Sequence, residues 1–179
     1  MKEIEFELNG EAYSLRLFQP ADAEALQQAA DYPEVAKGMS DRFASPYTFA
    51  DAEGFVNNVA IPSQGGILAI FAQEQLIGGI GLHGHQDVWR YNMEIGYWLT
   101  PAFWGRGLMK KILPLFLERA WGLYPDLHRV EGKVFSFNMG SAKVLEATGF
   151  RLEGKALEAV YKSGQFWDEY HYALLRTEG

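Results

Sequence analysis

The segment Trp104-Gly105-Arg106-Gly107 places two glycines between a strand-like run and an apolar run with helical spacing. The run before it, Met93–Leu99, carries the aromatic and β-branched residues that are typical of strands. In the run after it, Leu108 to Trp121, apolar residues recur at the spacing of one helix face. Because glycine lacks a Cβ, backbone N–H groups at this join can closely approach an anion, which a helix N-terminus already favours. The segment therefore predicts a strand–turn–helix unit that seats a pyrophosphate, although two glycines also occur where a helix simply begins.

A second strand and helix follow this unit. The run Arg129–Phe135 is predicted to be a strand, and the helix after it starts at Met139. Asn138 is a suitable N-cap for that helix, because its side chain can accept a hydrogen bond from a first-turn amide. Gly149 is a suitable end, since glycine tolerates the left-handed conformation that often closes a helix. The alternation of strands and helices favours parallel pairing through crossover helices.

Four blocks of the chain resemble the Gcn5-related N-acetyltransferases (GNAT) and, within them, the group that acetylates the N-termini of ribosomal proteins. The blocks are Glu94–Leu99, Trp104–Gly107, Asn138–Ser141 and Gly149–Gly154, with Asp168 near the last strand. The resemblance covers nearly the whole chain. One departure is Ala102, which stands where the family usually has glutamine or arginine at the start of its cofactor turn. This departure removes a side chain and leaves the backbone of the turn as the anion seat.

The resemblance implies one α/β domain over residues 1–179, with a mixed, splayed sheet of about seven strands flanked by about four helices. Asn9-Gly10 between two alternating runs predicts a hairpin at the start of the chain. Strands at 67–72 and 76–82, followed by a polar loop over 83–90 and the strand that holds Glu94, complete an antiparallel meander. Helices are expected over about 20–31 and about 49–59, and Pro114 is expected to bend the helix that starts at Leu108.

The family binds acetyl-CoA as a co-substrate, and the resemblance places its contacts on three segments. Amides of the glycine turn would hold the pyrophosphate, the end of the preceding strand would pair with the pantetheine arm, and Lys110 and Lys143 would add positive charge near the phosphates. The cofactor-binding residues so expected are Tyr97, Trp98, Leu99, Thr100, Trp104, Gly105, Arg106, Gly107, Leu108, Met109, Asn138, Ser141 and Lys143.

Ser141 is the expected proton donor to the departing thiolate. The resemblance places the serine of Asn138-Met139-Gly140-Ser141 beside the cofactor sulfur. The alternative is that Ser141 lies in the first turn of a helix that Asn138 caps, with no chemical role.

Glu94 is the expected general base for the amine. Alternation along its strand places Glu94 on the face opposite Ile95, and the alternative is a carboxylate that is only buried or paired. His83 and His85 share its direction and offer a proton relay at neutral pH, or are surface residues of a loop. No metal is expected, because the other histidines, His128 and His171, belong to distant elements and the chain has no cysteine.

Composition limits the remaining classes of function. The net charge of −7 disfavours a nucleic-acid partner and is compatible with a basic acceptor. The absence of cysteine excludes disulfides and a thiol nucleophile, and a reducing cytoplasm is compatible with it. No apolar run approaches the roughly 20 residues of a membrane span, and the N-terminus lacks a signal-peptide core. We therefore expect a cytoplasmic protein without a membrane or nucleic-acid partner.

The expected reaction is direct transfer of acetyl from acetyl-CoA to a primary amine, without an acyl-enzyme. The resemblance favours the α-amine of a protein N-terminus, perhaps of a ribosomal protein, and homodimers are frequent in the group. A small-molecule amine, such as an antibiotic or a polyamine, is the alternative acceptor. A binding module that holds acyl-CoA without turnover is the alternative from another class.

Overall fold

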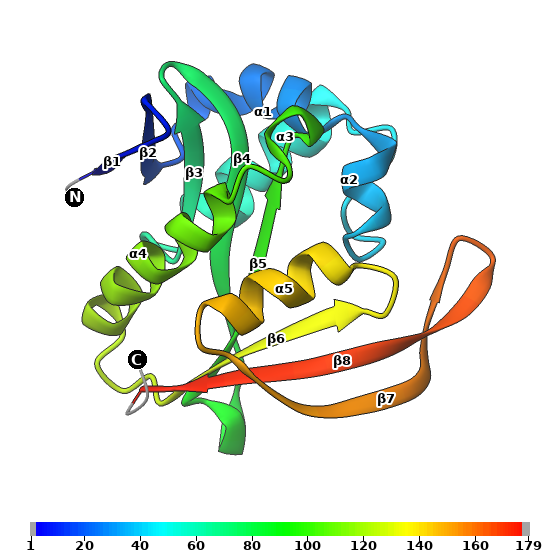
Figure 1. Ribbon diagram of the computed structural model, residues 1–179. Helices are drawn as coiled ribbons and strands as arrows, with labels where there is room; N and C mark the ends of the chain where they lie inside the picture. Colours follow the sequence, from blue (N-terminus) through cyan, green and yellow to red (C-terminus); the bar gives the residue numbers. More distant parts are fainter. Residues whose placement is uncertain (1–2, 177–179) are drawn as a thin grey trace. The chain divides into compact units, whose positions relative to one another are not determined.

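The computed structural model describes residues 3–176 (Figure 1). The chain forms two compact units, each made of two segments. Of the described residues, the first unit comprises 3–81 and 97–108, and the second comprises 82–96 and 109–176. Strands β4 (Gln75–Gly84) and β5 (Asn92–Leu99) each run from one unit into the other, so neither unit is a continuous piece of chain. The assignment of all residues to one domain stays a prediction.

The first unit contains an antiparallel meander. Strands β1 (Ile4–Leu8), β2 (Glu11–Leu17), β3 (Ile67–Ala72) and the first part of β4 pair in sequence order. The predicted hairpin between β1 and β2 is confirmed. Asn9 and Gly10 both have positive φ, 54° and 80°, which is the backbone geometry that an Asn-Gly turn supplies.

Helices α1 (Ala23–Ala30), α2 (Pro33–Lys37) and α3 (Phe49–Phe55) complete the first unit. A turn of 3-10 helix (Pro20–Asp22) precedes α1, and a π-helical stretch (Val56–Ala60) continues α3, so the expected helix over about 49–59 is present with a change of winding. The short α2 lies between these two expected helices, where no helix was predicted. The core of this unit is the buried cluster formed chiefly by Phe18, Leu26, Tyr47, Val56, Ile67 and Phe71.

The second unit is a mixed sheet with two helices. The first part of β5 pairs in parallel with β6 (Arg129–Phe135), and β6 pairs antiparallel with β8 (Gln165–Leu175). Strand β7 (Arg151–Lys162) pairs with β8 as a long hairpin at the edge of the sheet, drawn in orange and red in Figure 1. Helix α4 (Leu108–Leu123) starts at the last residue of the first unit, and α5 (Met139–Ala147) follows β6.

The described residues thus hold eight strands and five α-helices, one more of each than the approximate numbers expected. The additional helix is α2. Pro114 lies inside α4, which remains a single helix, as predicted. No helix in residues 3–176 is long and apolar enough to span a membrane.

Helix α5 packs closely on β6, beside which it lies in Figure 1. A Cβ placed on Gly132 of β6 would lie 2.8 Å from the Cδ1 atom of Leu145 on α5. Leu145 and the neighbouring β6 residues Val130 and Val134 are buried. The absence of a side chain at Gly132 therefore allows the helix to approach, and the face with Val130 and Val134 becomes the covered face of β6. The charged residues of β6 alternate onto the opposite face.

The end of β5 is anchored to α1 through Thr100. Its side chain is 5% exposed, and its hydroxyl donates a hydrogen bond of 3.0 Å to the carbonyl of Ala29. The Thr100 amide donates to the Ile77 carbonyl on β4 at 2.7 Å, and its own carbonyl accepts from the Phe103 amide at 2.9 Å. Every polar group of Thr100 is thus bonded within the first unit, immediately before the glycine turn.

We predict that Thr100→Val lowers the free energy of unfolding by about 1–3 kcal/mol, because the isosteric change leaves the buried Ala29 carbonyl without its donor. Thr100→Ser keeps the hydroxyl and should lose less. Urea denaturation of the three proteins measures both differences. Equal losses for the valine and serine variants would mean that the methyl group, not the hydrogen bond, is what matters at this position.

Candidate active site

The glycine turn has the backbone geometry that an anion seat requires. Gly105 and Gly107 have φ of 72° and 76°, a region that residues with a Cβ rarely adopt, and no other group lies within 4 Å of a Cβ built on either of them. The side chains of Leu108 and Met109 are buried, so the first turn of α4 offers its backbone rather than those side chains. A helix leaves its first four N–H groups without an acceptor inside the helix. These residues therefore fit a phosphate group of a bound co-substrate.

Two side chains of the turn are held by the first unit. The indole N–H of Trp104 donates to the Leu99 carbonyl at 2.7 Å, while about half of the Trp104 side chain remains exposed. The Arg106 guanidinium lies over the Phe103 ring, with its Cζ atom 5.0 Å from the ring centre. Its Nη1 atom is 3.7 Å from a carboxylate oxygen of Glu11 on β2. Within the first unit, these contacts join the turn to β2 and to the end of β5.

The expected contacts from the end of β5 are restricted to its backbone. The side chain of Leu99 is buried, and all polar groups of Thr100 are bonded within the protein. Trp98 packs against the core cluster of the first unit, with its ring centre 5.7 Å from that of Phe43. Tyr97 is half-buried. Pairing of this strand with a pantetheine arm stays a prediction that rests on main-chain groups.

Ser141 lies in the first turn of α5, in the second unit. The predicted cap is confirmed, since the Asn138 side chain accepts a hydrogen bond of 3.3 Å from the Ser141 amide. Ser141 is half-buried, whereas Lys143 on the next turn is exposed. This cap agrees with the alternative in which Ser141 begins a capped helix and has no chemical role. That the Ser141 hydroxyl donates a proton to the thiolate stays a prediction.

Glu94 lies at the point where the pairing of β5 with β6 ends. The parallel register joins only Asn92, Met93 and Glu94 of β5 to Arg129, Val130 and Glu131 of β6. The last pair places two carboxylates side by side on neighbouring strands. Like charges at directly paired positions destabilise a sheet, so this arrangement requires compensation by cations.

Lys133 on β6 supplies the nearest positive charge. Its Nζ atom is 2.8 Å from Oε2 of Glu94 and 3.9 Å from Oε1 of Glu131. The hydrogen bond to Glu94 is the main reason that the pKa of Lys133 lies above its usual value, and partial burial acts in the opposite direction. The side chains of Lys133 and Glu94 are each 36% exposed, so the pair can be reached from solvent.

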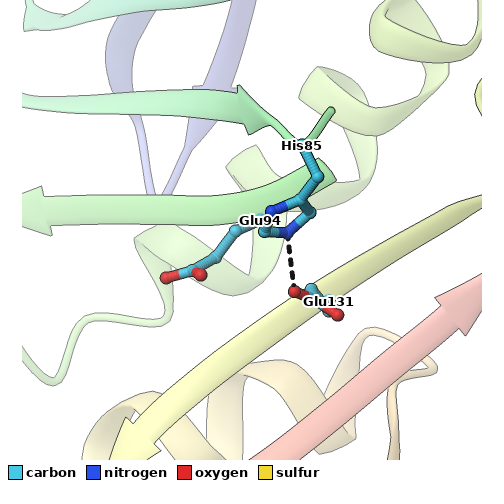
Figure 2. Close-up of side chains that lie close together, drawn as sticks. All are labelled: His85, Glu94 and Glu131. Carbon is cyan, nitrogen blue, oxygen red and sulfur yellow. Dashed lines mark hydrogen bonds and ion pairs between the residues drawn. The ribbon is translucent and has the colours of Figure 1, made fainter. Parts of the chain in front are cut away.

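His85, directly after β4, bonds to one of these two carboxylates, that of Glu131 (Figure 2). Its Nε2 atom is 2.8 Å from Oε1 of Glu131, and the other oxygen of Glu131 is 3.8 Å from the Arg129 guanidinium. One ligand atom from each of His85, Glu94 and Glu131 lies within 4.8 Å of the others, which is a spacing that a metal ion can use. The spacing of histidines and cysteines in the sequence does not reveal this cluster, because two of its three members are carboxylates on different strands. The Lys133 ammonium lies against two of the three residues and provides the positive charge there.

The other candidates from the sequence are placed differently. His83 belongs to β4 rather than to a loop, and its exposed ring lies beside Gly96. Asp168 on β8 accepts from the Glu158 amide at 2.9 Å and pairs with Lys155 at 2.6 Å, which lowers the pKa of Asp168. This carboxylate is therefore bonded within the β7–β8 hairpin.

Comparison with known proteins identifies the family. The sequence matches the acetyltransferase (GNAT) domain family over residues 14–151, more than half of the chain. The chain belongs to the GNAT acetyltransferases. The matched region contains the glycine turn, Glu94 and Ser141.

Relatives and solved structures agree with this assignment. YdaF of Bacillus subtilis (strain 168), whose name proposes a ribosomal N-acetyltransferase, is 31% identical over 94% of this chain and 93% of its own length. The ribosomal-protein-serine acetyltransferase of Escherichia coli (strain K12) is 26% identical over 84% of this chain and 79% of its own. The structure of Mycobacterium smegmatis RimJ in complex with CoA-disulfide has a TM-score of 0.81 at 20% identity, covering 98% of this chain and 88% of that one. At that identity the likeness shows the GNAT fold.

Sequence reasoning missed Lys133, Glu131 and Arg129 as members of the site. Their alternation with the apolar residues of β6 predicts that they share one face of the strand, and this signal was present. The sequence does not reveal the strand register that places Glu131 beside Glu94. Without that register, no partner can be predicted for Lys133. The two residues expected to be catalytic, Glu94 and Ser141, belong to the second unit, whereas the glycine turn belongs to the first.

We predict that Glu94→Gln lowers the pKa of Lys133 toward its ordinary value, because the amide no longer accepts a charge-assisted hydrogen bond. A raised lysine pKa means that the pair stabilises the fold fully at neutral pH and loses this effect as the pH rises through the Lys133 pKa. NMR titration of the lysine ε-carbons at alkaline pH measures the change. Lys155, whose pKa is raised by Asp168, serves as the internal control and should be unaffected.

Proposed function

We propose that the protein transfers the acetyl group of acetyl-CoA to the α-amine of a protein, and that the acceptor is a ribosomal protein. The neutral amine attacks the thioester carbonyl, a C–N bond forms, and the C–S bond breaks. The amine proton passes to Glu94 and from there to solvent. Ser141 donates a proton to the thiolate of CoA and takes one back from solvent, so both side chains return to their starting states. No acyl-enzyme is required, and the chain has no cysteine that would form a thioester.

The observation that carries the proposal is the open backbone turn at the start of α4. Gly105 and Gly107 adopt positive φ with free space above them, directly before a helix N-terminus. Backbone amides and the helix dipole at such a position favour a phosphate group. RimL was solved in complex with coenzyme A, with a TM-score of 0.79 to this chain, and MccE in complex with acetyl-CoA and AMP, with a TM-score of 0.77. These complexes support acetyl-CoA as the co-substrate.

The preference for an α-amine follows from the weak base that the site offers. An α-amine has a pKa near 8, so roughly a tenth of it is neutral at pH 7, whereas a lysine amine has a pKa near 10.4. Glu94 is partly exposed and already paired with Lys133, so it is suited to accept a proton from an amine that loses it readily. A lysine acceptor would require a free-energy input of about 4–5 kcal/mol for deprotonation at pH 7.

The choice of a ribosomal protein rests on the named relatives. The Escherichia coli relative acetylates a ribosomal-protein serine according to its name, and RimL is named for the ribosomal protein L7/L12. A solved ribosomal-protein-S5-alanine acetyltransferase from Vibrio fischeri covers 96% of this chain with a TM-score of 0.79. The net charge of −7 suits a basic partner.

The first experiment is calorimetric titration of the purified protein with acetyl-CoA, followed in the same sample by addition of peptides with free N-termini. We expect binding and peptide-dependent release of CoA thiol, because the turn holds the co-substrate and Glu94 serves the amine. The same peptides with acetylated N-termini should release none. Binding with release only by polyamines or aminoglycosides would replace the protein acceptor, and binding without any release would indicate an acyl-CoA sensor.

We predict that Gly107→Asp weakens acetyl-CoA binding about tenfold or more, because it adds a Cβ at positive φ and a negative charge at the phosphate seat. Gly164→Asp is the matched control. Gly164 has φ of 85° in the β7–β8 turn with similar free space, so it carries the same backbone strain away from the seat. Titration calorimetry on both variants compares the dissociation constants, and an equal effect of the two changes would move the seat elsewhere.

We predict that Ser141→Ala lowers kcat about 100-fold while changing the acetyl-CoA dissociation constant little, as expected for loss of a general acid. The cap survives, since the Asn138 side chain accepts from the Ser141 amide, which alanine also has. Steady-state kinetics and calorimetry on one preparation separate the two quantities. A wild-type rate would leave Ser141 with its structural role alone.

A further inference from the structure

Lys133 presents a primary ammonium group to the carboxylate that the proposed reaction needs. Its Nζ atom is 2.8 Å from Glu94, the proposed base, and 3.9 Å from Glu131. An α-ammonium group has the same tetrahedral nitrogen with three N–H donors. The chain's own lysine thus makes the contact with Glu94 that a charged acceptor would make on arrival.

The contact is exchangeable rather than locked. Both side chains are 36% exposed, and an ion pair at this exposure contributes little to stability. A lysine ammonium also lies at the end of a flexible four-carbon chain, which can turn toward solvent at low cost. By contrast, Arg129 on the same strand is held by two hydrogen bonds to Glu153 on β7, so it is not the group that leaves.

We propose that Lys133 competes with the acceptor for Glu94, so that an incoming primary ammonium group binds by displacing the Lys133 side chain. This inference rests on the proposed function, because it takes Glu94 as the group that meets the amine. Lys133 thereby sets the affinity for the acceptor. Displacement leaves the number of positive charges next to the two carboxylates unchanged, and it selects a cationic amine over a neutral or acetylated N-terminus.

The charged groups around Lys133 come from four elements of the second unit. Glu94 lies on β5, Glu131 on β6 and His85 after β4, while Glu169 on β8 acts on Lys133 through its charge. His171 lies 2.8 Å from Glu169. Lys133 has a raised pKa and therefore stays charged well above pH 8, so the competition changes with pH through the acceptor, whose α-amine loses its charge near pH 8.

Steady-state kinetics of Lys133→Met with a free-amine peptide test the proposal. At pH 7 we expect KM for the peptide to fall about two- to fivefold with little change in kcat, the range that matches the loss of one exposed ion pair. The gain should shrink between pH 7 and pH 9, as the peptide becomes neutral. Lys133→Arg keeps a cation beside both carboxylates and should retain the wild-type KM or exceed it. Chelator in all samples prevents a metal ion from replacing the lysine.

Lys155→Met is the matched control, because Lys155 forms an ion pair of similar length with Asp168 on the β7–β8 hairpin. It should leave KM unchanged at both pH values. An unchanged or higher KM in Lys133→Met, or the same change in both variants, would overturn the proposal. A merely structural role of Lys133 predicts a loss of stability without the pH-dependent change in KM.

A measurement without turnover keeps this inference separate from the proposed function. NMR of the lysine ε-carbons at pH 7, without acetyl-CoA, should show the Lys133 signal shifting saturably when a free-amine peptide is added. The Lys155 signal should stay in place, and the acetylated peptide should shift neither. No shift of Lys133 would overturn the inference even if CoA thiol is released, whereas a shift without thiol release would support displacement and refute the transfer reaction.

Discussion

The pairing of Glu94 with Glu131 is the constraint around which the charged face of the second unit is arranged. Two carboxylates side by side on neighbouring strands repel, so this register persists only with compensation. Lys133 lies against both, His85 bonds to Glu131, and Arg129 approaches its second oxygen. The Lys133 and Glu94 side chains remain partly exposed, so a cation from solution can reach the remaining negative charge of the carboxylates.

The proposed co-substrate and acceptor sites differ in the kind of group that forms them. The co-substrate seat is backbone, because buried Leu108 and Met109 anchor the first turn of α4 while Gly105 and Gly107 leave space above it. The acceptor site is made of ionised side chains whose positions depend on strand register. Backbone sites tolerate changes in neighbouring side chains, which is compatible with Ala102 at a position where the family usually has a longer residue.

Much of the secondary structure follows from local sequence signals, and the predictions that were wrong concern elements whose local signals are weak. Asn9-Gly10 specifies its hairpin, and Asn138 specifies the start of α5. Helix α2 was not predicted, because its five residues are too few for a periodic pattern. His83 was assigned to a loop, because its strand continues past the apolar run that marks β4. Such boundaries depend on pairing with a neighbouring strand.

The sequence alone determined the family, the glycine turn and the capped helix α5, because each depends on residues that are close together in the chain. Only the tertiary structure decided which charges surround Glu94. Helix α4 separates β5 from β6 in the sequence, and α5 packs on β6, so the register of the two strands depends on tertiary packing. A shift of one residue would send Glu131 and Lys133 to the opposite face. That packing, including the approach of Leu145 over Gly132, cannot be inferred from the spacing of the charged residues.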